Sequence, residues 1–408
     1  MNLEDAVSNA LKNSKEVVLA DFDQRIATSQ YHESLAIFLP QISASYSAMA
    51  TNNPLNVFGF KLQHQSVAET DFMPELLNSP GTYRDYAAQA VLQQPLFNWD
   101  LIKNRRAAKL QTYIKELQKQ RQKEYIAMQT ENEFMRLQFS YKAVQTIEET
   151  LEAVKSLYKN TKDHYDQGYV QKSDLLSVEV YVKSVETQLQ TAEDEIENFS
   201  DNLSILMGKS VGTIYQVDSL KSKLQTENAT LPKDRADFEA LSKASESYDQ
   251  LIKGTRGSVL PKLNGFASYQ YNDDQFAHFD HGSYLVGLEL KWDIFKGNSA
   301  RSKIKTQKIE QERIQEERRL LMAEGKRDLA KAKRQLESAQ YKITQTQTAV
   351  NQAREALKIL KNRYDEGLAS ITDVLLTQQQ LSQNQLLLQQ AILEQNMTLG
   401  YINFLTKH

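Results

Sequence analysis

The sequence contains no cysteine among its 408 residues. Disulfides, thiolate metal sites and cysteine nucleophiles are therefore excluded, and so is the cysteine that an N-terminal lipid anchor requires. Glycine and proline are also scarce, with 14 and 7 copies. Because these two residues interrupt helices and strands most often, we expect the elements of this chain to be long.

Long hydrophobic runs and an excess of one charge are missing as well. No apolar stretch reaches the ~20 residues of a membrane-spanning helix, and the mean hydropathy is -0.57. The formal net charge is only -3, without the basic excess of a nucleic-acid-binding protein. The chain opens on "MNLEDAVSNAL", an amphipathic helical pattern. We therefore expect either a cytoplasmic protein or a mature chain whose signal peptide has been replaced by an initiator methionine.

No group of residues has the spacing of a catalytic or cofactor site. His278 and His281 share one loop with Asp273, Asp274 and Asp280. Because three-residue spacing in a loop fixes no ligand geometry, a solvated acidic loop is favoured there over a metal site. The sequence has no phosphate-binding glycine loop and no nucleophile elbow. We predict a protein that is not an enzyme and that holds no metal or cofactor.

One thirteen-residue turn occurs twice. "HYDQGYVQKSDLL" begins at His164 and "RYDEGLASITDVL" begins at Arg363, with five identical positions at an offset of 199. The surrounding patterns repeat in the same order, which indicates a tandem duplication. We predict a first repeat over 1–210, a connector over 211–233 and a second repeat over 234–408.

Each repeat has the pattern of a helix, two strands, a very long helix, a turn and a returning helix. In the first repeat we expect a helix over 3–39, strands over 42–50 and 83–97 around a long loop at 51–81, helices over 98–166 and 173–207, and a tip at 167–173. In the second we expect a helix over 234–254, strands over 263–271 and 283–295, helices over 299–365 and 372–405, and a tip at 366–372.

The long helices have heptad seams. Apolar residues recur every 3.5 residues from Phe134 to Tyr165 and, in the same register, from Ile343 to Tyr364. Such spacing predicts coiled-coil packing, and the turn after each seam folds the next helix back. On periodicity alone, a structural coiled coil without a transport role fits equally well.

The last predicted strand alternates most clearly. Val286, Leu288 and Leu290 share one face, opposite Glu289 and Lys291. Strands of about ten residues with one apolar and one polar face are typical of transmembrane β-barrels. Four strands cannot close a barrel, so a membrane protein of this kind needs strands from several chains. The other interpretation is a soluble α+β protein with a small sheet covered by helices.

Together, the order of elements, the repeat and several short motifs resemble the TolC family of outer-membrane efflux proteins. The motifs are "FLPQISASY" and "VLPKLNGFASY" before the first strand of each repeat, "QPLF" and "WDIF" at strand-to-helix junctions, and the two tips. The resemblance covers essentially the whole chain. One departure is Trp99 and Asp100, where family members often have a glycine pair.

The resemblance implies a fold class and a set of partners. It implies a mainly α protein with a small β part, in which helical hairpins form an α-barrel tunnel and three chains contribute four strands each to a 12-stranded transmembrane β-barrel. The partners implied are two further copies, a periplasmic adaptor, an inner-membrane pump and outer-membrane lipid, but no nucleic acid. The localisation implied is the outer membrane of a Gram-negative bacterium, with an extension into the periplasm.

The resemblance also implies site residues. Tyr364, Asp174 and Asp373 correspond to residues of the pore gate, in which the tyrosine clasps an aspartate of the first tip. The second pore aspartate is replaced by Leu376, and the basic residue of the clasp by Ala369. The residues expected to contact the adaptor are Gly168, Tyr169, Val170, Gly367, Leu368 and Ala369, and those expected to face lipid are Val286, Leu288 and Leu290.

Two simpler interpretations of the tips stay open. Gly168 and Gly367 fit helix stops, and Asp174 and Asp373 fit N-caps of the returning helices. For the whole protein, we predict an exit duct that carries small molecules or proteins from an inner-membrane pump. The alternative is a structural coiled-coil scaffold; a hydrolase with a coiled-coil insertion lacks any nucleophile or metal cluster.

Overall fold

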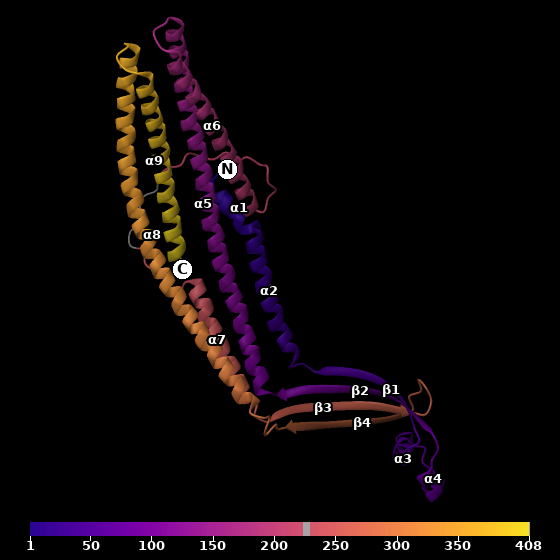
Figure 1. The fold of residues 1–408 in the computed structure, drawn as a ribbon. Helices are drawn as coiled ribbons and strands as arrows, with labels where there is room; N and C mark the ends of the chain where they lie inside the picture. The colour runs from indigo at the N-terminus through magenta and orange to yellow at the C-terminus, as the bar shows by residue number, and fades with distance from the viewer. Residues whose placement is uncertain (223–228, 408) are drawn as a thin grey trace. The chain divides into compact units, whose positions relative to one another are not determined.

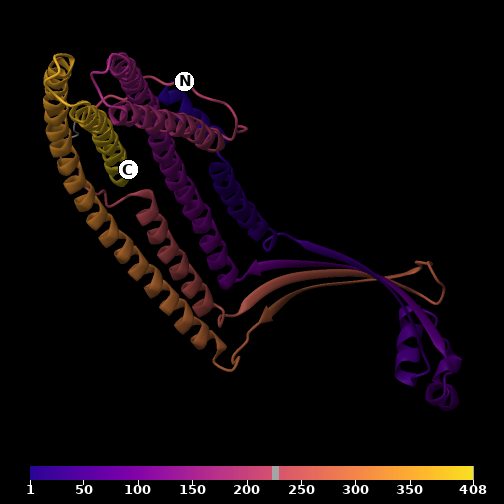
Figure 2. The same ribbon diagram turned by 45° about the horizontal axis from the view of Figure 1, so that its top comes forward.

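A computed structural model describes residues 1–222 and 229–407 of the chain (Figure 1 and Figure 2). The elements are α1 (Leu3–Asn13), α2 (Lys15–Ala36), β1 (Gln41–Thr51), α3 (Pro54–Gln63), the 3₁₀ helix η1 (Glu69–Phe72), α4 (Pro74–Asn78), β2 (Tyr83–Phe97), α5 (Trp99–Asp166), α6 (Lys172–Leu206), α7 (Ala236–Gly257), β3 (Lys262–Asp273), β4 (His281–Lys291), α8 (Ser299–Asp365) and α9 (Ile371–Thr406). Across the described residues, none of the helices is both long and apolar enough to cross a membrane. The predicted fold class, mainly helical with a small β part, is confirmed.

The chain forms two compact units, and each draws segments from both sequence repeats. The first unit contains Met1–Gln24, Lys115–Leu241 and Glu316–His408, and the second contains Arg25–Ile114 and Ser242–Gln315. The repeat boundaries expected from the sequence are therefore not the boundaries of the compact units. The long helices α5 and α8 contribute residues to both units.

The first unit is built from helices that pack along the predicted seams. Phe134, Leu137 and Val154 of α5 are almost fully buried, as are Val350 and Ala353 of α8. Burial of a Phe, Leu or Val side chain gives about 1.5–3 kcal/mol, so the seams stabilise these hairpins.

The second unit contains one antiparallel sheet with strand order β1-β2-β3-β4 (Figure 1). Side chains alternate between its two faces, and the register places Ala44, Ala90, Tyr269 and Tyr284 in one row across the sheet. Val286, Leu288 and Leu290 lie on this same face, which we call the apolar face. The opposite face, with Ser45, Gln89 and Gln270 in one row, is called the polar face.

The expectation of one continuous helix over 3–39 was wrong. Ser14 has a ψ of 133°, so α1 ends and α2 begins there. Because the break resets the helical register, an apolar spacing read across it does not predict which side chains of α2 are buried. Ala6, Ala10 and Val17 are buried, whereas Phe22 and Ile26 are exposed.

The segment at 51–81, expected as a loop, contains helices. Asn53 caps α3 through its side-chain oxygen, which accepts from the N–H groups of Leu55 and Asn56. Pro54 follows at the first helical position, where its missing N–H costs nothing. A sequence of Asn and Pro can thus start a helix as readily as a loop.

The last strand is shorter than predicted. It ends at Lys291, the partner of Lys262 at the start of β3, so no strand remains for the following residues to pair with. Trp292 and Ile294, assigned to the strand from their alternation, lie beyond it. The indole N–H of Trp292 instead donates to the carbonyl of Val259 at 2.9 Å.

Candidate functional site

The first tip is a tight reversal between α5 and α6. Gly168 has a φ of +78°, a value that glycine adopts without the penalty paid by other residues. Its N–H donates to Tyr165 O at 2.9 Å, and the N–H of Tyr169 donates to His164 O at 2.9 Å. This pair of bonds is a Schellman motif, which satisfies the last carbonyls of α5.

The second tip repeats this geometry between α8 and α9. Gly367 has a φ of +74°, its N–H donates to Tyr364 O at 2.9 Å, and the N–H of Leu368 donates to Arg363 O at 2.7 Å. No heavy atom comes within 4 Å of a Cβ built on either glycine. The glycines are therefore required by the backbone conformation rather than by crowding.

The two tip aspartates lie in the first turns of the returning helices, but they are not N-caps. The N-cap residues are Gln171 for α6 and Ser370 for α9. Asp174 accepts from the N–H of Gln171 at 3.1 Å, whereas Asp373 accepts from the hydroxyl of Ser370 at 2.7 Å. Each carboxylate thus lies three residues after the N-cap residue. Its negative charge is stabilised there by the positive end of the helix dipole.

Tyr364 joins the two repeats, although with a partner that the sequence did not identify. Its side chain is buried, and its hydroxyl lies 3.2 Å from that of Thr161 on α5. Burial raises the pKa of the Tyr364 phenol, so this group stays neutral at physiological pH. Among the described residues, no hydrogen bond links Tyr364 to Asp174. The expected clasp between these two side chains is thus not formed in this conformation.

An apolar cluster surrounds Tyr364 and holds the four helices together near the tips. Its buried members are Val154 and Leu157 of α5, Val178 and Val182 of α6, Tyr364 of α8, and Ile371, Val374 and Leu375 of α9. Since every helix of both hairpins contributes, the position of one tip depends on the packing of the other.

The ends of both tips present apolar side chains to solvent. Tyr169 is 78% exposed and Leu368 is 64% exposed, while Val170 and Ala369 beside them are half-buried. Exposed apolar side chains at corresponding positions of two turns are a candidate contact surface for another protein.

The apolar face of β4 is open in the single chain. Val286, Leu288 and Leu290 are 69%, 70% and 68% exposed. Glu289 on the polar face is also exposed. Both β1 and β4 are edge strands, each with a row of backbone groups free to pair with a further strand.

The loop between β3 and β4 holds an acidic group around one histidine. His278 Nδ1 lies 2.9 Å from Asp273 Oδ2 and 3.4 Å from Asp280 Oδ2. The hydrogen bond that His278 donates to Asp273 and the negative charge of Asp280 raise the pKa of His278. His281, grouped with His278 by sequence, instead stacks on His64 at a centroid distance of 6.5 Å.

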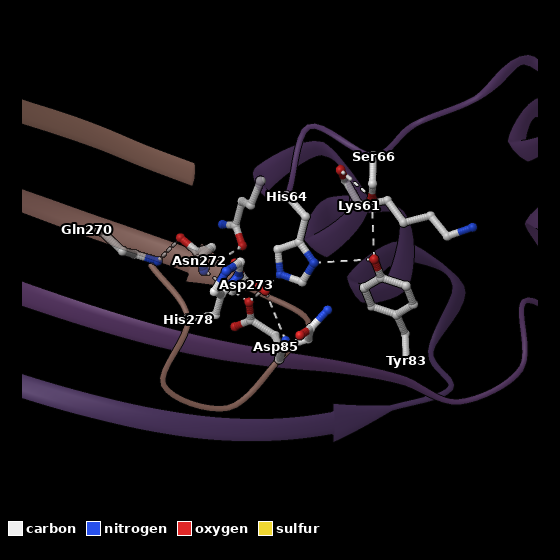
Figure 3. A network of polar contacts seen from close by, with 11 residues as sticks. Lys61, His64, Ser66, Tyr83, Asp85, Gln270, Asn272, Asp273 and His278 are labelled. Carbon is white, nitrogen blue, oxygen red and sulfur yellow. Dashed lines mark hydrogen bonds and ion pairs between the residues drawn. The ribbon is translucent and has the colours of Figure 1, made fainter. Parts of the chain in front are cut away.

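Sequence reasoning missed two further residues at the same end of the sheet. His64 and Asp85 are 3% and 1% exposed, and His64 Nε2 lies 2.8 Å from Asp85 Oδ1 (Figure 3). They are 21 residues apart on different elements, so no local spacing could have indicated the pair.

The fold resembles solved outer-membrane channels over nearly its whole length. VceC of Vibrio cholerae matches with a TM-score of 0.82 and 19% identity, over 99% of this chain and 96% of that one. CmeC of Campylobacter jejuni matches with a TM-score of 0.83 and 16% identity, over 99% and 85%. MtrE of Neisseria gonorrhoeae, described in its open state, matches with a TM-score of 0.81 and 14% identity, over 99% and 88%.

Sequence comparison gives the family directly. No curated protein sequence matches this chain. The family model described as outer membrane efflux protein matches residues 6–209 and 214–399, which cover most of both predicted repeats and include both tips. The family suggested by the sequence motifs is confirmed, and the chain belongs to the outer membrane efflux protein family.

Proposed function

We propose that three copies of this chain form an exit duct in the outer membrane of a Gram-negative bacterium. The observation that carries the proposal is the sheet, which has an exposed apolar face and two free edges. Unpaired edges are prohibitively costly in lipid. Three copies of the four-stranded sheet would pair every edge in a closed barrel of 12 strands.

In this assembly, the apolar face with Val286, Leu288 and Leu290 contacts lipid, and the polar face lines a water-filled lumen. That division follows from the alternation typical of membrane barrels. Lipid contact is confined to alternate residues of short strands, which fits the low mean hydropathy of -0.57. The helical hairpins continue the duct into the periplasm.

The tips are the proposed docking surface for a periplasmic adaptor, which links the duct to an inner-membrane pump. The exposed Tyr169 and Leu368, with their neighbours Val170 and Ala369, supply apolar contacts. Gly168 and Gly367 supply the reversal that presents them. The cargo would be small molecules or proteins delivered by the pump, and the duct itself performs no chemistry.

The tips are also the proposed gate. Tyr364 ties the second hairpin to the first, and Asp373 of three chains would form a ring of carboxylates close to the threefold axis. Asp174, next to the same cluster, is available to Tyr364 if the tips rearrange. A ring of like charges favours cations and can bind a multivalent cation that blocks the pore.

Extraction and assembly test the proposal against a coiled-coil scaffold. The chain is produced with a signal peptide in Gram-negative cells, and membrane fractions are extracted with and without detergent. We expect an outer-membrane protein that dissolves only in detergent, has the mass of a trimer and conducts ions in planar bilayers. A monodisperse, detergent-free monomer would support the scaffold and reject the duct.

A further inference from the structure

The segment between β1 and β2, residues 52–82, is a folded insertion rather than a loose loop. It contains α3, η1 and α4. Lys61 of α3 and Asp71 of η1 form an ion pair at 2.6 Å, and the rings of Phe58 and Phe72 meet edge to face at 5.7 Å. The insertion is therefore braced by contacts of its own.

The insertion is anchored to the polar face of the sheet. Asn272 is paired with Ala87, two residues from Asp85, and its amide donates to Asp85 Oδ1 at 3.0 Å. Asp85 and Asn272 thus lie on one face. Gln270 lies on the same face, two residues before Asn272, and contacts it at 2.8 Å.

Two side chains at the end of α3 bind this face, and Figure 3 shows one of them, His64, beside Tyr83 and Asp85. His64 Nε2 lies 2.8 Å from Asp85 Oδ1, and His64 Nδ1 lies 3.2 Å from the hydroxyl of Tyr83. Gln63 accepts from the amide of Asn272 at 3.3 Å. Because Asp85 is buried, loss of His64 would remove one of its hydrogen-bond partners and leave the amide of Asn272, so the contact with His64 favours the docked position.

The loop between β3 and β4 goes to the opposite face. The N–H of Ala277 donates to the hydroxyl of Tyr46 at 2.8 Å. Phe276 and Phe279 pack edge to face on the same tyrosine at 5.7 and 6.3 Å. One connection at this end of the sheet therefore covers the apolar face with aromatic rings, and the other covers the polar face with hydrogen bonds.

We propose that the insertion narrows the outer mouth of the channel and sets which solutes leave it. This inference rests on the proposed function, in which the polar face lines the lumen. Each of the three copies would then hold an insertion inside the lumen, at the end where β1 and β3 finish. The constriction would be distinct from the gate at the hairpin tips.

The insertion would also select by charge. Its only lysine, Lys61, is paired with Asp71, while Glu69 and Glu75 are exposed. Three copies would bring six exposed glutamates to the mouth. Carboxylates that line a pore favour cations over anions, so large anionic solutes would be the class most strongly retarded.

Thiol labelling from outside intact cells tests the constriction, because the natural chain has no cysteine. Ser268→Cys places a thiol on the polar face and Ala267→Cys, its neighbour, places one on the apolar face. Each is made in the full chain and in a variant whose residues 54–78 are replaced by a Gly/Ser linker. The probes are a small charged methanethiosulfonate and a bulky polyethylene-glycol maleimide.

With the insertion present, we expect Ser268→Cys to react with the small probe and not with the bulky one. Without the insertion, both probes react. Ala267→Cys should react with neither, because lipid covers it. Equal reaction of the bulky probe with and without the insertion, or no reaction in either, would overturn the constriction. Failure of the small probe at Ser268→Cys in assembled trimers would instead reject the water-filled lumen and thus the proposed function.

A point variant covers the case in which the linker variant does not assemble. His64→Ala removes the anchor, and Leu55→Ala, on an exposed position of the same helix, is the matched control. We expect His64→Ala to admit the bulky probe to Ser268→Cys and Leu55→Ala to exclude it. Exclusion in both variants, in trimers that resist dissociation in detergent, would contradict the proposal.

Discussion

The hydroxyl of Tyr364 lies 3.2 Å from the hydroxyl of Thr161, and this contact joins the second hairpin to the first inside a buried apolar cluster. A buried hydroxyl that loses its partner costs about 1–3 kcal/mol. A cost of this size is large enough to shift the open–closed equilibrium of the proposed gate.

Removal of this link should favour the open tip. We expect Tyr364→Phe and Thr161→Val each to raise the conductance of the closed trimer, because a loss of about 1 kcal/mol changes an open-closed equilibrium roughly fivefold. The double variant should exceed neither single variant, since both remove the same bond. Thr146→Val, which loses only a bond to its own helix backbone, is the control in single-channel recordings. Additive effects would show that the two hydroxyls act separately.

Loss of the Asp373 carboxylate should change ion selectivity. Asp373→Ala should reduce the preference for cations and the block by divalent ions in planar bilayers, because the ring loses its charge. The Ala variant also loses the hydrogen bond from the Ser370 hydroxyl, worth about 0.5–1.5 kcal/mol. Asp373→Asn keeps a hydrogen-bonding side chain and removes only the charge. Unchanged reversal potentials in both variants would leave Asp373 as part of the helix cap alone.

Substitution of the tip glycines should separate docking from assembly. Gly168→Val and Gly367→Val force a branched residue into a left-handed conformation, which costs at least about 1–2 kcal/mol locally. We expect export with the cognate adaptor to be lost while trimers still form, as measured by substrate retention and by detergent-resistant migration. Gly59→Ala, on α3 with open space around it, is the control. Loss of the trimer in the tip variants would mean that the glycines serve folding only.

The two faces of β4 should differ in their tolerance of charge. Arginine at Leu288 should impair insertion, at a cost of ~2–4 kcal/mol if the residue lies near the middle of the bilayer. Arginine at Glu289, the adjacent residue on the polar face, should be accepted. The amount of trimer in outer-membrane fractions measures both. Equal tolerance would indicate that β4 belongs to a sheet that does not meet lipid.

The β3–β4 loop should loosen as the pH rises. The pKa of His278 is raised above 6.5 by its hydrogen bond to Asp273 and the charge of Asp280. Protonation therefore stabilises the loop fully below pH 6.5, and this stabilisation is lost as the pH passes through the raised value. Limited proteolysis between Asp273 and His281 should be faster at about pH 8.5 than at about pH 6, and His278→Gln should remove the difference. A pH-independent cleavage rate in the natural chain would contradict the ion pair.

Sequence patterns predicted the features that repeat over many residues. The seams on α5 and α8, the alternation of β4 and the two glycine reversals all follow from local spacing, and each was found. The predictions were wrong where one backbone dihedral sets an element's boundary or one polar contact sets a residue's partner. The extended conformation of Ser14 separates α1 from α2, although no glycine or proline near it indicates a break in the helix.

Among the site residues, those in a repeated motif were predicted from sequence, and those brought together by single tertiary contacts were not. The tips were identified because their motif is duplicated, whereas the partner of Tyr364 was assigned to Asp174 by resemblance and proved to be Thr161 in this conformation. Thr161 lies within the predicted seam from Phe134 to Tyr165, and the seam's spacing predicts packing but not the hydrogen bond to Tyr364. His64 and Asp85 are brought together by the fold of the insertion, and the spacing between them carries no such information.

The two free edges of the sheet have a genetic consequence. If β1 of one chain pairs with β4 of the next, every barrel needs three sound chains, and a single defective edge leaves a gap in the ring. In a cell that makes natural and edge-defective chains in equal amounts, roughly one trimer in eight would contain only natural chains. A mutation confined to an edge strand would therefore be dominant over the natural allele, whereas deletion of the gene would be recessive.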